Sequence, residues 1–344
     1  MKRTAVYLLK CFVAGIIAIV LLSLFALMYY NLPTNIRQPA LITNNRFVPD
    51  SNWSYMLEGY GYGKTDSLGY NNTYFDGDFQ PDIVCVGSSH LEALQVPHDA
   101  NCVYLLNEKF DKDGIDENNF KCLNIGMSAH FFEISASNYE YIVNEFKGAK
   151  YILVEALDVK FSSSELDKII NGEYHSPIKK NKPKLSYKDI PYYKLLYKKF
   201  SEARNAKNTS NTVANGGNLP LKDEYDFSVY EEKMNIVLSK ISRISAENNV
   251  IPVIFMHENF SVDAEGNVVI GENEIYKKAF KKCCENNGIE VVDVLDEMIS
   301  NYKQNFEFPY GYSNSVPGKG HLNKMGHEMI AEALYEKINE MEGR

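Results

Sequence analysis

Residues 82–90 read Asp-Ile-Val-Cys-Val-Gly-Ser-Ser-His. The apolar run from Ile83 to Val86 has the length and composition of a buried strand, and it stops abruptly at Gly87-Ser88-Ser89. In an open α/β sheet, ligand-binding and catalytic groups lie at the carboxyl ends of the strands. The stretch therefore predicts an α/β sheet whose first strand presents the hydroxyl of Ser89 at that edge.

The rest of the chain continues the alternation of strands and helices. Further apolar runs occur at 121–126, 150–154, 250–256 and 289–294. Apolar residues at helical spacing occur at 131–146, 229–248, 275–286 and 325–341. Strands separated by helices favour a parallel sheet that is covered on both faces. We expect a three-layer α/β/α fold with a five-stranded, mostly parallel sheet of flavodoxin-like type.

The N-terminus carries an apolar segment. Cys11 to Tyr30 is twenty residues without a charge, which is about the length needed to cross a bilayer as a helix. Lys2, Arg3 and Lys10 precede it, so residues 1–10 are expected in the cytoplasm and the rest outside the cell membrane. A cleaved signal peptide is the alternative, but no small-x-small cleavage site follows Tyr30. We expect a single-pass membrane anchor.

The remaining chain divides into a stem and one large domain. Residues 31–80 are predicted to be a stem whose later, aromatic part packs on the domain, and 81–342 the domain itself. An insertion at 160–228 interrupts it, and ten Lys or Arg residues lie within 176–207 among several tyrosines. The insertion could be a lid or substrate platform, or a solvated helical hairpin. Its basic, aromatic surface could also face anionic lipid or an anionic wall polymer.

Charge and cysteine content exclude some function classes. The formal net charge of −9 gives no reason to expect a nucleic-acid partner. The six cysteines lack zinc-like spacing, and His321 and His327 are six residues apart, so no metal and no cofactor are expected. We expect buried free thiols, with a bridge between Cys102 and Cys122 as the alternative.

Three positions have the chemistry of acyl transfer. Ser89 is the candidate nucleophile, and its own amide is a candidate oxyanion donor. His321, in Gly320-His321-Leu322-Asn323 before the last helix, is the candidate base. Gly126, at the end of the second strand, is the candidate second oxyanion donor. The structural alternatives are a helix cap, a loop histidine and a turn glycine.

Together these blocks resemble the SGNH, or GDSL-like, hydrolases over residues 80–340. Gly87-Ser88-Ser89 corresponds to the Gly-Asp-Ser block, and Gly126 to the second-block glycine. His321-Leu322-Asn323 with Gly326-His327 corresponds to the last block. The resemblance implies that Ser89 is acylated, that His321 acts as base and then as acid, and that Gly126 helps to hold the oxyanion.

The chain departs from the family pattern twice. Leu157 stands where the third block has its oxyanion asparagine, and Gly318 and Lys319 stand where the family has the aspartate that orients the histidine. Another acid could orient His321, or the site could be a Ser–His dyad. The expected substrate-contacting or orienting residues are His90, Glu155, Asp158, His257 and Asn323, and Glu307 is a further candidate acid.

The resemblance extends to membrane-anchored relatives that lack the asparagine block. These include exported proteins of cell-surface polysaccharide O-acetylation and of teichoic-acid D-alanylation, which work beside a multispanning acyltransferase. We expect an extracytoplasmic, serine-dependent esterase or O-acyltransferase that acts on an acylated glycan or wall polymer. The expected partners are the bilayer and a multispanning membrane acyltransferase. The alternative is an inactive relative that binds a glycan or such a partner.

Overall fold

The computed structural model describes residues 2–32, 35–36, 46–72, 80–112, 120–174, 191–201, 227–270 and 274–343. A five-stranded parallel sheet of order β12-β9-β8-β6-β7 forms its centre. Its strands are β6 (Ile83–Val86), β7 (Cys122–Asn124), β8 (Tyr151–Ala156), β9 (Ile251–Met256) and β12 (Glu290–Asp293). In chain order this is 2-1-3-4-5 from one edge, the flavodoxin-like arrangement. The predicted fold class is confirmed.

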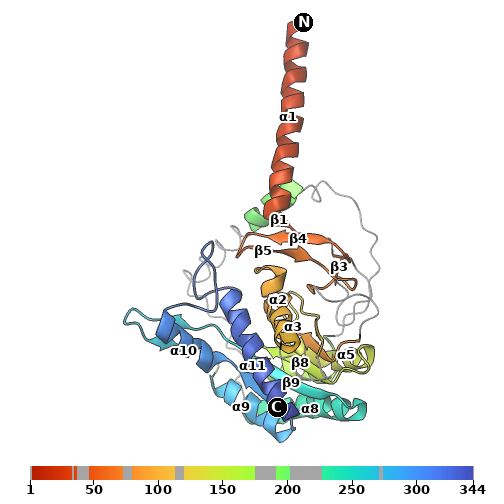
Figure 1. Cartoon of the computed structure of the whole chain (residues 1–344), viewed down its shortest axis with the longest axis vertical. Coiled ribbons are helices and arrows are strands. Elements are labelled where there is room, and N and C mark those ends of the chain that lie inside the picture. Colours follow the sequence, from red (N-terminus) through yellow and green to blue (C-terminus); the bar gives the residue numbers. More distant parts are fainter. Residues whose placement is uncertain are drawn as a thin grey trace.

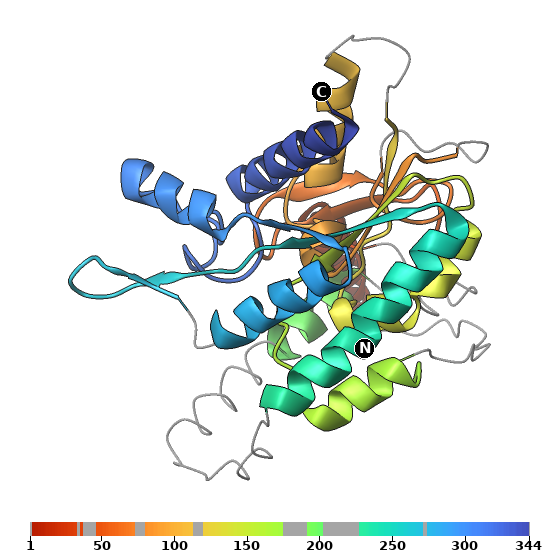
Figure 2. The same cartoon turned by 90° about the horizontal axis from the view of Figure 1, so that it is seen from below.

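Helices cover both faces of this sheet, as Figure 2 shows with the strands running between them. One face packs mainly on α3 (Cys102–Lys112), α10 (Leu295–Asn305) and α11 (Lys324–Glu342). The other packs mainly on α4 (Phe132–Ser137), α5 (Tyr139–Glu145), α8 (Phe227–Asn248) and α9 (Glu274–Asn286). Alternate residues of each strand enter the two cores, and all four side chains of β6 are fully buried. Burial of each such Val or Ile contributes about 1.5–3 kcal/mol.

The single helix expected over 131–146 is instead two helices, α4 and α5, which meet at Asn138. The side-chain amide of Asn138 donates a hydrogen bond to the carbonyl of Ile134 and so interacts with the helix backbone. The remaining short elements are α2 (Ser89–Glu92), η1 (His98–Ala100) and α6 (Ser163–Ile170), with the strand pairs β2 (Asn35–Ile36)–β3 (Arg46–Phe47) and β10 (Ser261–Val262)–β11 (Val268–Val269).

The N-terminal apolar segment forms α1 (Lys2–Tyr29), which projects from the domain (Figure 1). Within it, Thr4–Tyr29 contains an 18-residue window with a mean hydropathy of 2.8, and it is the one described helix long and apolar enough to cross a membrane. Length and composition alone fit both a membrane span and a signal sequence. Of the cysteines, Cys11 lies on this helix, and all six thiols are free, so Cys102 and Cys122 are not bridged.

Described parts of the chain at the end of α1 and after it form a second, small sheet. It consists of β1 (Tyr30–Asn31), β4 (Asn52–Tyr55) and β5 (Gly61–Lys64), in the antiparallel order β1-β4-β5. Figure 1 places it between α1 and α2. The β4–β5 hairpin therefore lies directly over the helix that begins with Ser89.

Candidate active site

The turn after β6 presents Ser89 at the carboxyl edge of the sheet. Ser88 is the N-cap of α2, and its Oγ accepts a hydrogen bond from the His90 amide at 3.3 Å. Ser89 is thus the first residue of the helix, where backbone amides have no partner within the helix. Gly87 lets Glu155 approach from the neighbouring strand, since a Cβ at position 87 would lie 2.5 Å from the Cβ of Glu155.

His321 reaches Ser89 from the loop before α11. Its Nε2 lies 3.0 Å from Ser89 Oγ, although the two residues are 232 positions apart in the chain. The loop is held because the Gly311 amide donates to the His321 carbonyl at 2.9 Å. The structure therefore brings together the two residues expected to be the nucleophile and the base.

The acid that orients His321 is Glu58, which lies in the turn between β4 and β5. Glu58 Oε2 is 2.7 Å from His321 Nδ1, and Oε1 accepts the backbone N–H of His321 at 2.7 Å. This arrangement favours the tautomer with the proton on Nδ1, so that Nε2 can accept the Ser89 proton. Burial raises the pKa of Glu58, but the hydrogen bonds and charge of His321 outweigh it, and the pKa is lowered overall. Glu58 is therefore ionised at neutral pH.

Two contacts explain how the hairpin carries this carboxylate to the histidine. Gly320 has a left-handed φ of +86°, and a Cβ there would lie 2.1 Å from Glu58 Oε1. Asn314, from the same loop as His321, accepts the Gly59 amide at 2.8 Å and donates to the Gly59 carbonyl at 2.9 Å. The loop of His321 and the turn of Glu58 are therefore joined directly.

The acids proposed from sequence lie elsewhere. Glu155 is buried and accepts the Ser88 amide, while its Oε1 lies 2.9 Å from His257 Nε2. Asp158 Oδ1 accepts the amide of Lys160, and Glu307 is exposed. Neither these two nor Glu155 is hydrogen-bonded to His321 in the described structure, so the expectation that one of them orients it is replaced by Glu58.

Gly126 does not present its amide to Ser89. Its N–H donates to Asn124 Oδ1 at 2.8 Å, so it is already used within the turn after β7. The glycine is needed for close packing instead, because a Cβ there would lie 2.7 Å from the Glu92 amide nitrogen of α2. The expected second oxyanion donor is thus corrected to a packing position. The Ser89 amide has no acceptor within the described part of the chain.

The remaining histidines and Asn323 support the site. His90 Nδ1 accepts the Leu322 amide at 3.2 Å, and burial keeps the pKa of His90 well below its usual value. His257 Nδ1 lies 2.6 Å from the hydroxyl of Tyr310. His327 is buried, and its Nδ1 accepts the Cys102 amide. Asn323 caps α11 by accepting the Gly326 amide.

Glu92 is a buried acid that lies one turn after Ser89. Burial raises the pKa of Glu92 to about 7, although Ser128 donates hydrogen bonds to it. Because the folded state then favours the protonated acid, its contribution to stability is present below the ordinary pKa near 4.5 and is lost as the pH rises through about 7.

We therefore expect Glu92→Gln to remove a pH-dependent loss of stability. Between about pH 5 and about pH 8 the variant should lose less unfolding free energy than the parent, by on the order of 3 kcal/mol. Urea unfolding at both pH values measures this difference. Burial also raises the pKa of Asp66, to about 6. Asp66 is the same in both proteins, so its contribution to the pH dependence cancels in the comparison. An equal loss of stability in both proteins would show that Glu92 does not titrate in this range.

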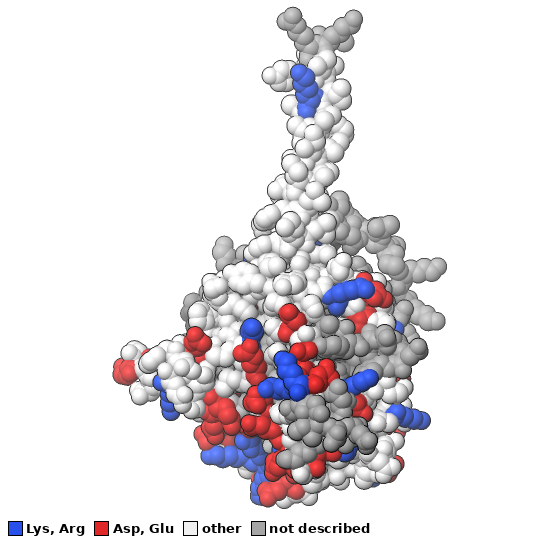
Figure 3. All heavy atoms as spheres, viewed as in Figure 1, with Lys and Arg blue, Asp and Glu red and all other residues white. Residues whose placement is uncertain are grey.

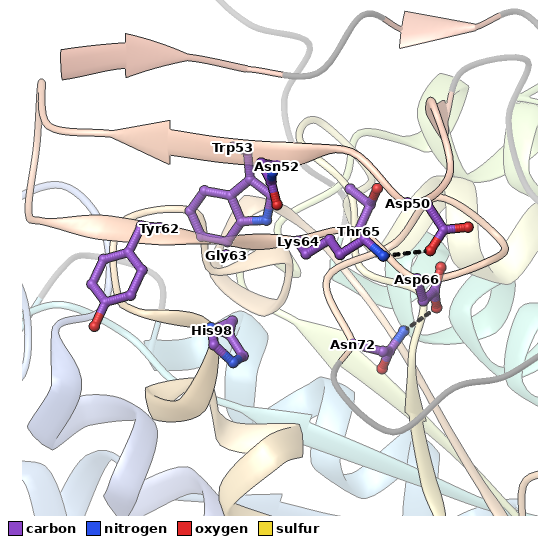
Figure 4. A pocket seen from close by; sticks show the side chains of 10 residues that line it. All are labelled: Asp50, Asn52, Trp53, Tyr62, Gly63, Lys64, Thr65, Asp66, Asn72 and His98. Carbon is purple, nitrogen blue, oxygen red and sulfur yellow. Dashed lines mark hydrogen bonds and ion pairs between the residues drawn. The ribbon is translucent and has the colours of Figure 1, made fainter. Parts of the chain in front are cut away.

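Two cavities adjoin these residues. The smaller, of about 250 Å³, is lined by His90, Leu157, Asp158, His257, Glu258, Asn259, Tyr310 and Gly320, of which His90 follows Ser89 and Gly320 precedes His321 in the chain. The larger, of about 550 Å³, runs beside β5 (Figure 4). Tyr62 lies at one end of it, Asp66 and Asn72 lie at the other, and His98 lies between them. None of the three residues of the Ser89–His321–Glu58 chain is among the residues that line these two cavities.

Comparison with known proteins gives remote structural similarities. No family model and no curated protein matches the sequence. The acetyl xylan esterase AlAXEase is 12% identical, with a TM-score of 0.40 over 74% of this chain and 99% of that chain. A putative GDSL-like lipase from Parabacteroides merdae is 12% identical, with a TM-score of 0.38 over 75% and 96%. A putative acylhydrolase from Bacteroides fragilis is 9% identical, with a TM-score of 0.36 over 77% and 89%. The fold assignment rests on the sheet order.

Proposed function

We propose that the protein is a serine-dependent acyl esterase or O-acyltransferase. The supporting observation is the chain of contacts from Glu58 through His321 to Ser89, at 2.7 and 3.0 Å. A serine hydroxyl is a weak nucleophile unless a base takes its proton, and a base is effective when a third group fixes its tautomer. Three sequence segments that are far apart provide these three parts in the required order.

The reaction would proceed in two balanced steps. Ser89 Oγ attacks the ester carbonyl while its proton passes to His321 Nε2, and the carbonyl oxygen becomes the oxyanion beside the Ser89 amide. The C–O bond of the ester breaks, the alcohol leaves with the proton from His321, and Ser89 is acylated. Water or a sugar hydroxyl then attacks the acyl group and gives its proton to His321. The bond between the acyl carbon and Ser89 Oγ breaks, and His321 returns the proton to Ser89 Oγ. Glu58 stays ionised throughout and stabilises the imidazolium.

The lining of the small cavity supports a short acyl group on a polar carrier. Asp158, Glu258 and Asn259 border this space together with His90 and Gly320, the chain neighbours of Ser89 and His321. Burying a long alkyl chain against such groups would leave polar atoms without water or partners, which is costly. We therefore favour a small ester, such as an acetyl group, over a lipid acyl chain.

We further propose that the acyl carrier is a glycan or wall polymer at the outer surface of a membrane that α1 crosses. The cavity beside β5 supports this, because Tyr62 is about half exposed and carboxylate, amide and lysine groups lie along the same space. Aromatic faces and polar groups of this kind suit sugar rings. A multispanning acyltransferase is the proposed partner in the transferase version of the reaction.

The active-site proposal is tested by labelling the full-length protein with a fluorophosphonate, which reacts with activated serines. We expect labelling of the parent protein and none of Ser89→Ala. The His321→Ala protein should label at least about 100-fold more slowly, because general-base assistance is worth about 10²–10⁴-fold. Ser300→Ala, which alters an exposed serine of α10, is the control and should label normally. Equal labelling of Ser89→Ala and the parent would refute the proposal.

The glycan proposal predicts a separation between substrates. Tyr62→Ala should raise KM several-fold for an acetylated polysaccharide, because stacking on an aromatic ring contributes about 1 kcal/mol or more. Its kcat/KM for p-nitrophenyl acetate should stay within about two-fold of the parent, since Tyr62 lines a cavity that Ser89, His321 and Glu58 do not line. Tyr141→Ala, which alters an exposed tyrosine of α5, is the control. Equal losses on both substrates would mean that Tyr62 supports the fold and does not bind glycan.

A second candidate function is binding without turnover. The amide of Gly126 is used by Asn124, and Leu157 replaces the third-block asparagine, so the oxyanion would rely on the Ser89 amide. A protein of this kind would bind acylated glycan or a membrane partner while Ser89 stayed unreactive. Glycan binding that persists in the absence of any fluorophosphonate labelling would favour it.

A further inference from the structure

A short basic helix at residues 191–201 lies beside the end of α1. Lys194 Nζ donates to the carbonyl of Leu32 at 2.9 Å, and Leu32 is three residues beyond the end of α1. Figures 1 and 2 both show this helix, in green, next to the axis of α1. It is part of the insertion after β8, so two segments far apart in sequence meet where the apolar helix joins the domain.

One face of this helix is aromatic and exposed. Tyr193, Tyr197 and Phe200 are 39%, 65% and 70% exposed. Their spacing of four and three residues puts them on the same side of the helix. Lys198 and Lys199 lie next to this stripe in the sequence, within the same two turns. A basic helix with exposed aromatic residues on one face is typical of segments that lie in a membrane interface.

The charge distribution of the domain agrees with a membrane on this side. On the face shown in Figure 3, the surface around the base of α1 carries few charged residues, whereas acidic and basic residues gather toward the opposite end of the domain. Desolvating charges near a bilayer is costly, so a surface that approaches lipid is expected to be poor in them. Lysines are the exception, because their ammonium groups can reach anionic headgroups.

We propose that residues 191–201 form an interfacial helix that rests on the outer surface of the bilayer, with Tyr193, Tyr197 and Phe200 in the headgroup region. Lys198 and Lys199 would face anionic lipid headgroups. The inference rests on the anchor role of α1 in the proposed function. It adds a second attachment, which would fix the tilt of the domain on the membrane.

This attachment would hold the active site close to the bilayer. The Met56 amide donates to the carbonyl of Tyr29 at 2.9 Å, and Ser54 Oγ donates to the carbonyl of Leu27 at 2.9 Å. Glu58 lies two residues after Met56, which is at most about 7 Å of chain. Glu58 is therefore held close to the last turn of α1. A substrate presented at the membrane surface would reach Ser89 more readily than a polymer far from it.

The test measures the membrane depth of single labels in the full-length protein. An environment-sensitive fluorophore is attached by cysteine in Tyr197→Cys and in Tyr141→Cys, both in a Cys11→Ser background. The other five thiols are buried, which makes them poor nucleophiles. Tyr141, on α5, is a matched exposed tyrosine, 55% exposed. Each protein is reconstituted into nanodiscs of phosphatidylcholine and phosphatidylglycerol that contain a lipid with a shallow nitroxide.

We expect a blue shift and strong nitroxide quenching at position 197 and neither at position 141. Adding Lys198→Gln and Lys199→Gln should reduce the quenching at 197. A label on native Cys11 reports insertion of α1 in a parallel sample, and fluorophosphonate labelling of Ser89 reports the active site. Quenching at Cys11 with none at 197 overturns the interfacial helix while the anchor stands. No quenching at Cys11 overturns both. Neither result depends on whether Ser89 is reactive.

Discussion

Glu58→Gln is expected to lower kcat for a soluble acetyl ester by about 10³–10⁴-fold, with little change in KM. The amide keeps the size of the side chain but cannot hold the Nδ1 proton of His321 as the carboxylate does at 2.7 Å. The histidine then loses the tautomer that accepts the Ser89 proton, and the imidazolium loses its counter-charge. Steady-state kinetics with p-nitrophenyl acetate measure the effect.

One of the acids expected from sequence provides the control for Glu58. Glu307→Gln should retain nearly full activity, because this exposed side chain does not bond to His321 in the described structure. The lowered pKa of Glu58 means that its carboxylate is lost only as the pH falls below the ordinary range of an acid. The ratio of parent to Glu58→Gln activity should therefore stay constant across neutral pH. Normal activity of Glu58→Gln, or an equally large loss in Glu307→Gln, would contradict this assignment.

The central sheet and the Ser89–His321 pair could be predicted because local pattern and topology determine them. Each of the five apolar runs is a strand, and parallel strands place their carboxyl ends on one edge. A serine that follows the first strand and a histidine before the last helix are then expected at the same edge of the sheet. The prediction needed no knowledge of side-chain packing.

Glu58 could not be predicted, because its contact with His321 depends on how a separate small sheet packs on the domain. The sequence did hold one signal, the glycines at 59, 61 and 63. A Cβ at Gly59 would lie 2.1 Å from the Gln95 carbonyl oxygen, and one at Gly61 would lie 2.0 Å from that of Leu94. Alternating glycines indicate that a strand lies against another backbone. Here that backbone is the segment just after the nucleophile helix, which brings Glu58 to the site.

The roles of Gly126 and Glu155 were mistaken for a related reason. A glycine at the end of a strand suggests a free amide, but the side chain of Asn124, two residues earlier, occupies it. An acid at the end of β8 suggests a partner for His321. Gly87 has no side chain, however, so Glu155 packs against the turn that precedes Ser89. The positions of Gly126 and Glu155 both depend on short-range side-chain contacts, and the spacing of residues in the sequence does not determine such contacts.

Glu155→Ala is expected to destabilise the protein by about 3–5 kcal/mol, because it removes one partner from a buried polar network. Glu155 accepts the Ser88 amide and contacts His257, which in turn bonds to the hydroxyl of Tyr310. All three side chains are almost fully buried. Without the carboxylate, the Ser88 amide and His257 Nε2 would be left without partners away from water, and each such group costs about 1–3 kcal/mol.

Glu155→Gln distinguishes the loss of these hydrogen bonds from the loss of side-chain packing. The glutamine carbonyl can still accept the Ser88 amide, and its amino group can donate to His257 if the imidazole proton moves to Nδ1 and is donated to Tyr310. We therefore expect Glu155→Gln to lose less than half of the stability that Glu155→Ala loses in urea unfolding. Fluorophosphonate labelling of Ser89 should recover in parallel, since the Ser88 turn positions the nucleophile. If Glu155→Ala unfolds at the same urea concentration as the parent, the network does not hold this turn, and the position of Ser89 must depend on the Glu58 hairpin alone.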